Sequence, residues 1–283
     1  MKIQKRLLVA YVLVMFTVFG VVPGVVTPQA EALYSNKKVA RICSDVSVIS
    51  HRGETGSYNG SQHDENTIHA FKGAVKRGAN VIETDLRLTK DGVWIIMHDP
   101  TLGRTTYGQG RVNAKTLDQI QALKTTHGYN VPTLQKLIKT FADDKSVGFQ
   151  LELKDAGATT EQLQQVVDLL EANGVLDRVL FTSTLSKNLR RIKELSPTTP
   201  TGYIAIGTTR PKLATLLEHK VNYVMIHHTR LTEVYVNRMA GNGIQVSARS
   251  ATKSSEYKLI VAKGATRVVV DDVKGYNNWC RGL

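Results

Sequence analysis

Four groups of ionisable side chains in the sequence have types and spacing suited to chemistry. They are His51-Arg52, the pair Glu83 and Asp85, His98, and the pair Glu152 and Lys154. Histidine accepts and donates protons near neutral pH. Carboxylates two residues apart on a strand point the same way and can hold a divalent cation through their oxygens. Arginine and lysine bind phosphate oxygens. Together these groups predict metal-assisted chemistry on a phosphoryl group.

These groups lie at or near the ends of predicted strands. Short apolar runs predict strands at 46–50, 81–88, 147–153, 179–182, 202–206, 223–226, 244–248 and 267–271. Helical patterns between them predict helices that begin near 67 and span 134–141, 160–173, 186–195, 211–219, 232–241 and 253–263. Each predicted strand except the last is therefore followed by a helix.

A further strand, at 93–97, follows 81–88 after only the turn Lys90-Asp91-Gly92. A parallel crossover needs a dozen or more residues, so this strand must run antiparallel. Eight parallel strands remain, and the sequence predicts a (β/α)₈ TIM barrel with a β-hairpin arm and a small insertion after strand two. An open doubly wound sheet is the alternative. In a barrel, the C-terminal strand ends would bring the four groups together, with His98 delivered by the arm.

The order of these motifs closely resembles the glycerophosphodiester phosphodiesterase family. That family shows His-Arg-Gly, Glu-Asn-Thr, Glu-x-Asp, Thr-x-Asp-Gly, His-Asp and Glu-x-Lys. The corresponding residues here are His51-Arg52-Gly53, Glu65-Asn66-Thr67, Glu83-Thr84-Asp85, Thr89-Lys90-Asp91-Gly92, His98-Asp99 and Glu152-Leu153-Lys154. The motif match covers roughly residues 46–155, and beyond that the likeness is one of architecture.

The resemblance implies roles for eight residues. Glu83, Asp85 and Glu152 would bind a divalent metal, Ca²⁺ or Mg²⁺. His51 and His98 would be the catalytic acid/base pair, with the base unassigned. Arg52 and Lys154 would bind phosphate, and Glu65 would belong to the surrounding polar network. The implied reaction begins with attack of a substrate hydroxyl on phosphorus, and water then opens the cyclic phosphate.

The implied activity is hydrolysis of small phosphodiesters, glycerophosphodiesters above all, to sn-glycerol 3-phosphate and an alcohol. Two alternatives remain: a phospholipase C- or D-like enzyme acting on lyso or intact lipids, and a non-catalytic envelope protein that binds polyanions. Near its end the family commonly shows Trp-Thr-Val-Asn, where this chain has Ser247-Ala248-Arg249-Ser250. The missing tryptophan leaves the head group open, and Arg249 makes a more anionic one plausible.

The first 32 residues have the pattern of a signal peptide. Lys2, Lys5 and Arg6 precede an apolar run, and Ala30-Glu31-Ala32 offers small residues for cleavage. The sequence thus predicts a secreted or cell-envelope protein with a mature TIM-barrel domain at 33–283; an uncleaved membrane anchor is the alternative. Without residues 1–32 the net charge is (37 − 3) − (24 − 1), or +11.

This charge would draw the protein to polyanions such as anionic lipid or teichoic acid, unless it serves only solubility. No specific nucleic-acid partner is indicated, and the oligomeric state stays open.

The two cysteines, Cys43 and Cys280, lie near opposite ends of the mature chain. Barrel closure would bring the two ends together, so an oxidising compartment predicts a disulfide, with two buried free thiols as the alternative.

Overall fold

The structure is a computed structural model, and it describes residue 43, residues 45–55 and residues 63–282. The predicted signal peptide at 1–32 lies outside the described residues. In the described part of the chain no helix is long and apolar enough to cross a membrane.

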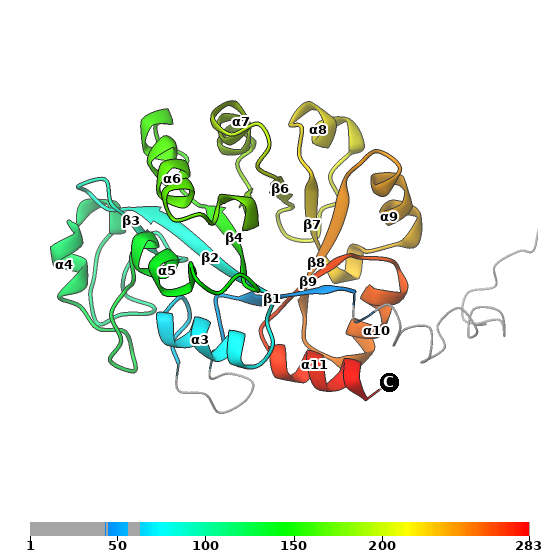
Figure 1. Ribbon diagram of the computed structural model, residues 1–283, viewed down its shortest axis with the longest axis horizontal. Helices are drawn as coiled ribbons and strands as arrows, with labels where there is room; N and C mark the ends of the chain where they lie inside the picture. Colours follow the sequence, from blue (N-terminus) through cyan, green and yellow to red (C-terminus); the bar gives the residue numbers. More distant parts are fainter. Residues whose placement is uncertain (1–42, 44, 56–62, 283) are drawn as a thin grey trace, which may run out of the picture.

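Eight parallel strands of the described chain form a closed barrel (Figure 1). They are β1 (Ser47–His51), β2 (Val81–Leu88), β4 (Gly148–Leu153), β5 (Val179–Ser183), β6 (Thr201–Ile204), β7 (Tyr223–His227), β8 (Gln245–Ala251) and β9 (Arg267–Val270). The barrel closes because β1 pairs in parallel with both β2 and β9. An open sheet has no such pairing, so the (β/α)₈ prediction is confirmed and the doubly wound alternative is wrong.

Helices surround this barrel on its outside (Figure 1). They are α3 (Ile68–Lys76), α4 (Leu117–Gln121), α5 (Leu134–Phe141), α6 (Thr160–Ala172), α7 (Ser186–Leu195), α8 (Leu213–Glu218), α9 (Glu233–Ala240), α10 (Ser254–Ala262) and α11 (Val273–Arg281). Short 3₁₀ turns span Val112–Ala114, Leu176–Arg178 and His228–Arg230.

The expectation that no helix follows the last strand is wrong. Helix α11 begins after Asp272, whose side chain accepts a hydrogen bond from the Gly275 backbone N–H. The helix buries only Val273 and Tyr276. Its exposed polar residues and its internal glycine hide the apolar periodicity that would have predicted it.

The arm after β2 has the predicted antiparallel form. Strand β3 (Trp94–Ile96) pairs with β2 in the register Leu86↔Ile96. The insertion that follows carries α4 and packs its own small core, which includes Ile95, Met97 and Leu102. This core fixes the position of the chain at His98, directly after the arm.

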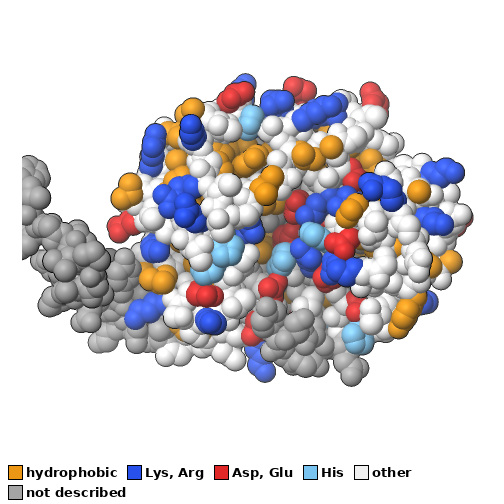
Figure 2. Space-filling view, turned by 180° about the vertical axis from the view of Figure 1, so that it is seen from behind, with side chains coloured by type: hydrophobic (Ala, Val, Ile, Leu, Met, Phe, Trp, Pro, Cys, Tyr) orange, Lys and Arg blue, Asp and Glu red, His pale blue; other side chains and the backbone are white. Residues whose placement is uncertain are grey.

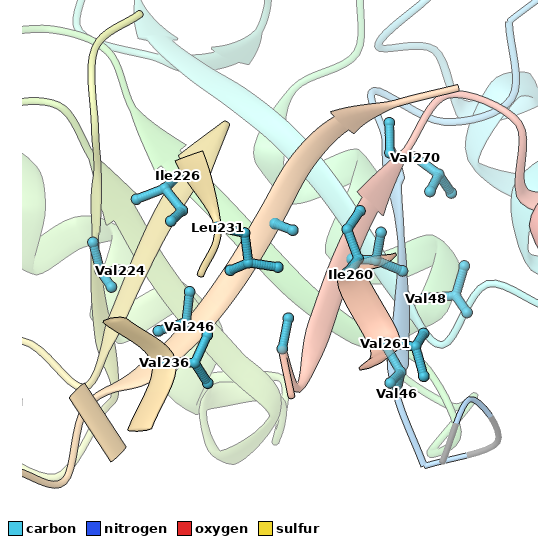
Figure 3. Close-up of a cluster of buried hydrophobic side chains, with 14 of the residues drawn as sticks. Val46, Val48, Val224, Ile226, Leu231, Val236, Val246, Ile260, Val261 and Val270 are labelled. Atoms are coloured by element: carbon cyan, nitrogen blue, oxygen red, sulfur yellow. The ribbon is translucent and has the colours of Figure 1, made fainter. Parts of the chain in front are cut away.

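Strand residues alternate between the helices and the barrel interior. Val48, Val246 and Val270 point outwards and pack against α9 and α10 residues such as Val236 and Ile260 (Figure 3). Burying each such side chain contributes roughly 1.5–3 kcal/mol relative to exposure. The alternate residues Ile49, Val81 and Val269 form a small apolar cluster inside the barrel. Because of the same alternation, the polar residues that lie nearer the C-terminal ends of these strands also point into the barrel interior.

A disulfide joins Cys43, just before β1, to Cys280 in α11. The bridge spans 237 residues of sequence. It fastens α11 at the seam where β1 meets β9, and Tyr257, Tyr276 and Trp279 pack their rings beside it. The predicted pairing of the two cysteines is therefore present in the structure.

Replacing both cysteines by serine should lower the free energy of unfolding by about 2–5 kcal/mol, because the unfolded chain loses a long-range cross-link. Urea unfolding of the oxidised protein and of Cys43→Ser/Cys280→Ser would measure the difference. Wild-type protein kept in reductant is the matched control and should resemble the variant. Equal unfolding midpoints for all three samples would contradict a structural role for the bridge.

Candidate active site

The acidic residues of the site come from two neighbouring strands with aligned register. On β2, Glu83 and Asp85 continue the inward-facing set that begins at Val81, and Asp85 pairs in register with Glu152 of β4. The three side chains are buried, and one oxygen of each lies within 4.8 Å of the others. Three carboxylates at this spacing offer the oxygen ligands that hard divalent cations prefer.

The electrostatics of this triad also suit a cation. Burial and the neighbouring charge of Asp85 raise the pKa of Glu83. Burial raises the pKa of Glu152 as well, although Lys154 opposes the effect. For Asp85 the charges of Lys154 and Arg52 outweigh burial and lower the pKa. Crowded carboxylates that resist ionisation together are stabilised in their charged form by a divalent cation, so the residues fit a metal.

Two cationic side chains lie against the triad. The Lys154 Nζ is 2.8 Å from Glu152 Oε1 and 3.1 Å from Asp85 Oδ1. The Arg52 Nε is 3.4 Å from Asp85 Oδ2, and its Nη1 donates to Glu65 Oε1 at 3.1 Å. Both pKa values are raised, because nearby carboxylates outweigh the effect of burial. Both side chains are therefore positively charged at neutral pH.

The backbone at the end of β1 turns sharply to aim Arg52 at the acids. Arg52 has φ 56° and Gly53 has φ 86°. A Cβ at Gly53 would lie 2.7 Å from Ala70 atoms, so glycine is required both by its backbone conformation and by the closeness of α3. The turn also lets the Arg52 backbone N–H donate to Glu83 Oε2 at 3.0 Å.

Asn66 braces the triad from the chain just before α3. Its Nδ2 donates to Asp85 Oδ2 at 2.8 Å, and its Oδ1 accepts from Thr84 Oγ1 at 2.9 Å. Asn66 is 4% exposed and has φ 59°, a region that asparagine tolerates better than most residues. Thr67 caps α3 by accepting from the Ala70 backbone N–H. Asn66 therefore fixes one oxygen of Asp85 in place.

Each of the two histidines is held by a carboxylate that contacts its Nδ1 atom. His51 Nδ1 lies 2.6 Å from Asp271 Oδ1, and His98 Nδ1 lies 2.6 Å from Asp99 Oδ1. An Nδ1–H that donates to a carboxylate leaves Nε2 of each ring free for proton transfer. Arg87 also fixes the backbone of His98, because its Nε and Nη2 donate to the His98 carbonyl oxygen.

The surroundings move the two histidine pKa values in opposite directions. Burial would lower the pKa of His51, but its hydrogen bond to Asp271 and the charge of Glu83 outweigh burial and raise it. Burial lowers the pKa of His98, and Lys154 and Arg52 add to this effect against the opposing influence of Asp85 and Asp99. His51 therefore holds a proton to higher pH than His98 does.

A cavity of about 390 Å³ connects these groups. Figure 2 shows charged and histidine side chains gathered around a hollow on one face of the molecule. Side chains on one side of the cavity include His51, Glu83, His98, Glu152 and Lys154. The opposite side, from the ends of β6, β7 and β8, includes Ile204, Ala205, Ile206, Met225 and Arg249. The cavity thus has a highly charged half and a largely apolar half.

The structure brings the residues singled out in the sequence together. His51, His98, Arg52, Lys154, Glu83 and Glu152 line the cavity, Asp85 lies buried among them, and Glu65 pairs with Arg52. Sequence reasoning missed the brace Asn66, the histidine partner Asp271 and the cation Arg104, which binds Asp99 and Glu65. The sequence feature that could have identified Asp271 as a site residue is its position directly after the last strand.

Comparison with known proteins gives a consistent family match. The model of the Glycerophosphoryl diester phosphodiesterase family matches residues 51–274. The YhdW protein of Bacillus subtilis (strain 168), whose glycerophosphodiester phosphodiesterase assignment is provisional, is 31% identical over 238 residues, covering 79% of this chain and 93% of its own. A glycerophosphodiester phosphodiesterase from Caldanaerobacter subterraneus is 26% identical over 243 residues, covering 83% and 97% respectively.

A solved structure shares the fold. An Oleispira antarctica phosphodiesterase, crystallised with the product sn-glycerol-3-phosphate, superposes with a TM-score of 0.74. Its sequence is 24% identical, and the match covers 83% of this chain and 96% of that one. The likeness extends over the whole barrel.

Replacing Asn66 by alanine should lower the free energy of unfolding by about 2–4 kcal/mol, since a buried carboxylate loses a donor and alanine is strained at positive φ. Asn66→Gly is the matched variant: it loses the same hydrogen bonds but tolerates the backbone, so it should be about 1 kcal/mol more stable than Asn66→Ala. Denaturant unfolding without added metal measures both. Wild-type stability in the alanine variant would contradict the bracing role.

Proposed function

Because the chain belongs to the glycerophosphoryl diester phosphodiesterase family, we propose that it hydrolyses glycerophosphodiesters by histidine acid/base catalysis with a divalent metal. The chain is a phosphoric diester hydrolase of this family. The proposed catalysis by histidines and a metal rests on one observation. A single cavity contains two histidines, each held by a carboxylate, next to a buried acidic triad. Two fixed histidines that can transfer protons, next to a site for a cation, are well suited to phosphodiester hydrolysis.

In this proposal, Glu83, Asp85 and Glu152 hold Ca²⁺ or Mg²⁺. Their all-oxygen donor set, their burial and the raised pKa values of Glu83 and Glu152 support the assignment. When bound, the metal supplies Lewis-acid stabilisation of the negative charge that develops on the phosphoryl oxygens. Arg52 and Lys154 add fixed positive charge next to the triad and orient the phosphate.

We assign the base to His98 and the acid to His51. The lowered pKa of His98 leaves its ring neutral, so its Nε2 can remove the proton from a substrate glycerol hydroxyl that attacks phosphorus. The raised pKa of His51 favours the protonated ring, which can give a proton to the departing alcohol. For the second step, in which water opens the cyclic phosphate, the two roles reverse.

The product of this reaction is sn-glycerol 3-phosphate together with the free alcohol. The Oleispira antarctica relative binds that same product in a barrel of the same fold. The cavity of about 390 Å³ has room for a small phosphodiester. These observations support a small glycerophosphodiester as the substrate.

We also propose that the enzyme works outside the cytoplasm. The signal-like residues 1–32, the Cys43–Cys280 disulfide and a charge of (37 − 3) − (24 − 1) = +11 on residues 33–283 support this location. A basic protein in the envelope would encounter anionic lipid or teichoic acid, whose deacylated or released glycerophosphodiester fragments are suitable substrates.

The purified protein should release sn-glycerol 3-phosphate from glycerophosphocholine or glycerophosphoglycerol in Ca²⁺ or Mg²⁺, and chelator should abolish the release. Glu152→Gln should lower kcat/KM by at least about 100-fold, since it removes one anionic ligand oxygen. Coupled assay of the released phosphate ester measures both. Glu161→Gln, on the exposed start of α6, is the matched control and should keep full activity. Absence of turnover on every phosphodiester with either metal would sink the proposal.

The assignment of base and acid predicts which limb of the pH profile each carboxylate partner controls. Activity rises as His98 loses its proton and falls as His51 loses its proton. Asp271→Asn removes the charge that helps raise the pKa of His51, so the alkaline limb of kcat/KM should move down by about one pH unit. Asp99→Asn should instead move the acidic limb to lower pH. Profiles at saturating metal test this order of pKa values, and an exchange of the two limbs would show that His98 has the higher pKa, which removes the basis of the assignment.

A further inference from the structure

Arg249 is the cation in the cavity that has no carboxylate partner. The other lysine and arginine residues lining the cavity, Arg52 and Lys154, each lie within 4.0 Å of carboxylates. In the described part of the chain no Asp or Glu oxygen lies that close to Arg249. Burial lowers the pKa of Arg249, and Glu152 is the charge that opposes this effect. Its positive charge is therefore balanced much less than those beside the triad.

The backbone aims Arg249 into the cavity. A register irregularity between Arg249 and Ala251 interrupts the pairing of β8 with β9, and Ser250 has φ 66°. Irregularities of this kind re-aim a side chain near an active site. The guanidinium is then held in place, because Nη2 donates to the Ala205 carbonyl at 2.7 Å and to the Gly207 carbonyl at 2.9 Å.

Much of the donor capacity of this guanidinium is unused. A guanidinium has five N–H groups, of which the two on Nη2 bind carbonyls and the one on Nε is buried without a partner, so the donors open to a ligand are those on Nη1. Nη1 makes only a 3.5 Å contact with Ser250 Oγ. A half-buried cation that is held rigidly and retains free donors is suited to bind an oxyanion.

We propose that Arg249 binds a second anionic group, carried by the alcohol part of the substrate. This inference rests on the proposed glycerophosphodiesterase function. The reacting phosphate belongs at the charged half of the cavity, so the rest of the substrate reaches the half formed by β6, β7 and β8. In a glycerophosphodiester the glycerol carries only hydroxyls, so a second anion can come only from the alcohol. The preferred substrates are therefore glycerophosphodiesters whose alcohol bears a phosphate or a carboxylate.

Three substrates with matched three-carbon alcohols test the proposal: the glycerophosphodiesters of glycerol, of glycerate and of glycerol phosphate. The wild-type kcat/KM should be at least about 10-fold higher for the two anionic alcohols than for glycerol, as expected for a charge-assisted hydrogen bond. Comparison of the phosphate and carboxylate substrates identifies which oxyanion the site takes. The preference should lie mainly in KM, because Arg249 touches a part of the substrate that does not react.

Arg249→Gln should remove this preference, lowering kcat/KM by roughly 10- to 100-fold on the anionic substrates and less than about 3-fold on the glycerol substrate. Arg249→Lys should retain part of the preference. Arg210→Gln is the matched control, since Arg210 lies in the chain after β6 and binds the Arg230 carbonyl away from this cavity.

Equal losses on all three substrates would show that Arg249 is only structural and would overturn the inference. Equal wild-type activity on neutral and anionic alcohols would overturn it too, while leaving the proposed function intact. If wild-type protein hydrolyses none of the three, the proposed function itself fails, and this inference fails with it.

Discussion

The mutual repulsion of three buried carboxylates is the constraint on which the site depends. Glu83, Asp85 and Glu152 are brought together by the register of two parallel strands, and the barrel interior shields them from water. Such a cluster opposes folding unless positive charge and hydrogen bonds offset it. Lys154, Arg52 and Asn66 supply part of that compensation. The remaining imbalance favours a cation at the proposed metal site.

Much of the surrounding structure serves this arrangement. The left-handed turn at Arg52 and Gly53, and the left-handed Asn66, are conformations that cost energy but place donors against the carboxylates. Glu65 links Arg52 to Arg104, and Arg104 continues to Asp99 and so to His98. His98 and the acidic triad are thus connected by one network of hydrogen bonds and ion pairs, and a change in one part affects the positions of the others.

The sequence was sufficient for the barrel because its strands are short apolar runs and its helices have regular periodicity. It was also sufficient to predict that the main side chains of the candidate site lie close together, since most of them lie at or near the ends of strands that must meet. Helix α11 escaped prediction because Val273 and Tyr276 are its only fully buried residues. Asp271 and Arg104 were not predicted as site residues because each acts through a contact with a residue that is distant in the sequence. Asp271 contacts His51, and Arg104 binds Glu65. The positive φ of Ser250, which aims Arg249, follows from the interrupted pairing of β8 and β9, which no local pattern shows.

The Cys43–Cys280 bridge has a further consequence. It makes the barrel, from the first strand to the last helix, a single covalent ring. A protease that cuts one peptide bond in any loop between the two cysteines would open this ring without separating two fragments. The nicked halves would stay tethered at the seam of the barrel, where β1 and β9 lie side by side. Such a chain tolerates backbone damage that would dissociate an unlinked barrel, and it could accept new termini in its loops by circular permutation.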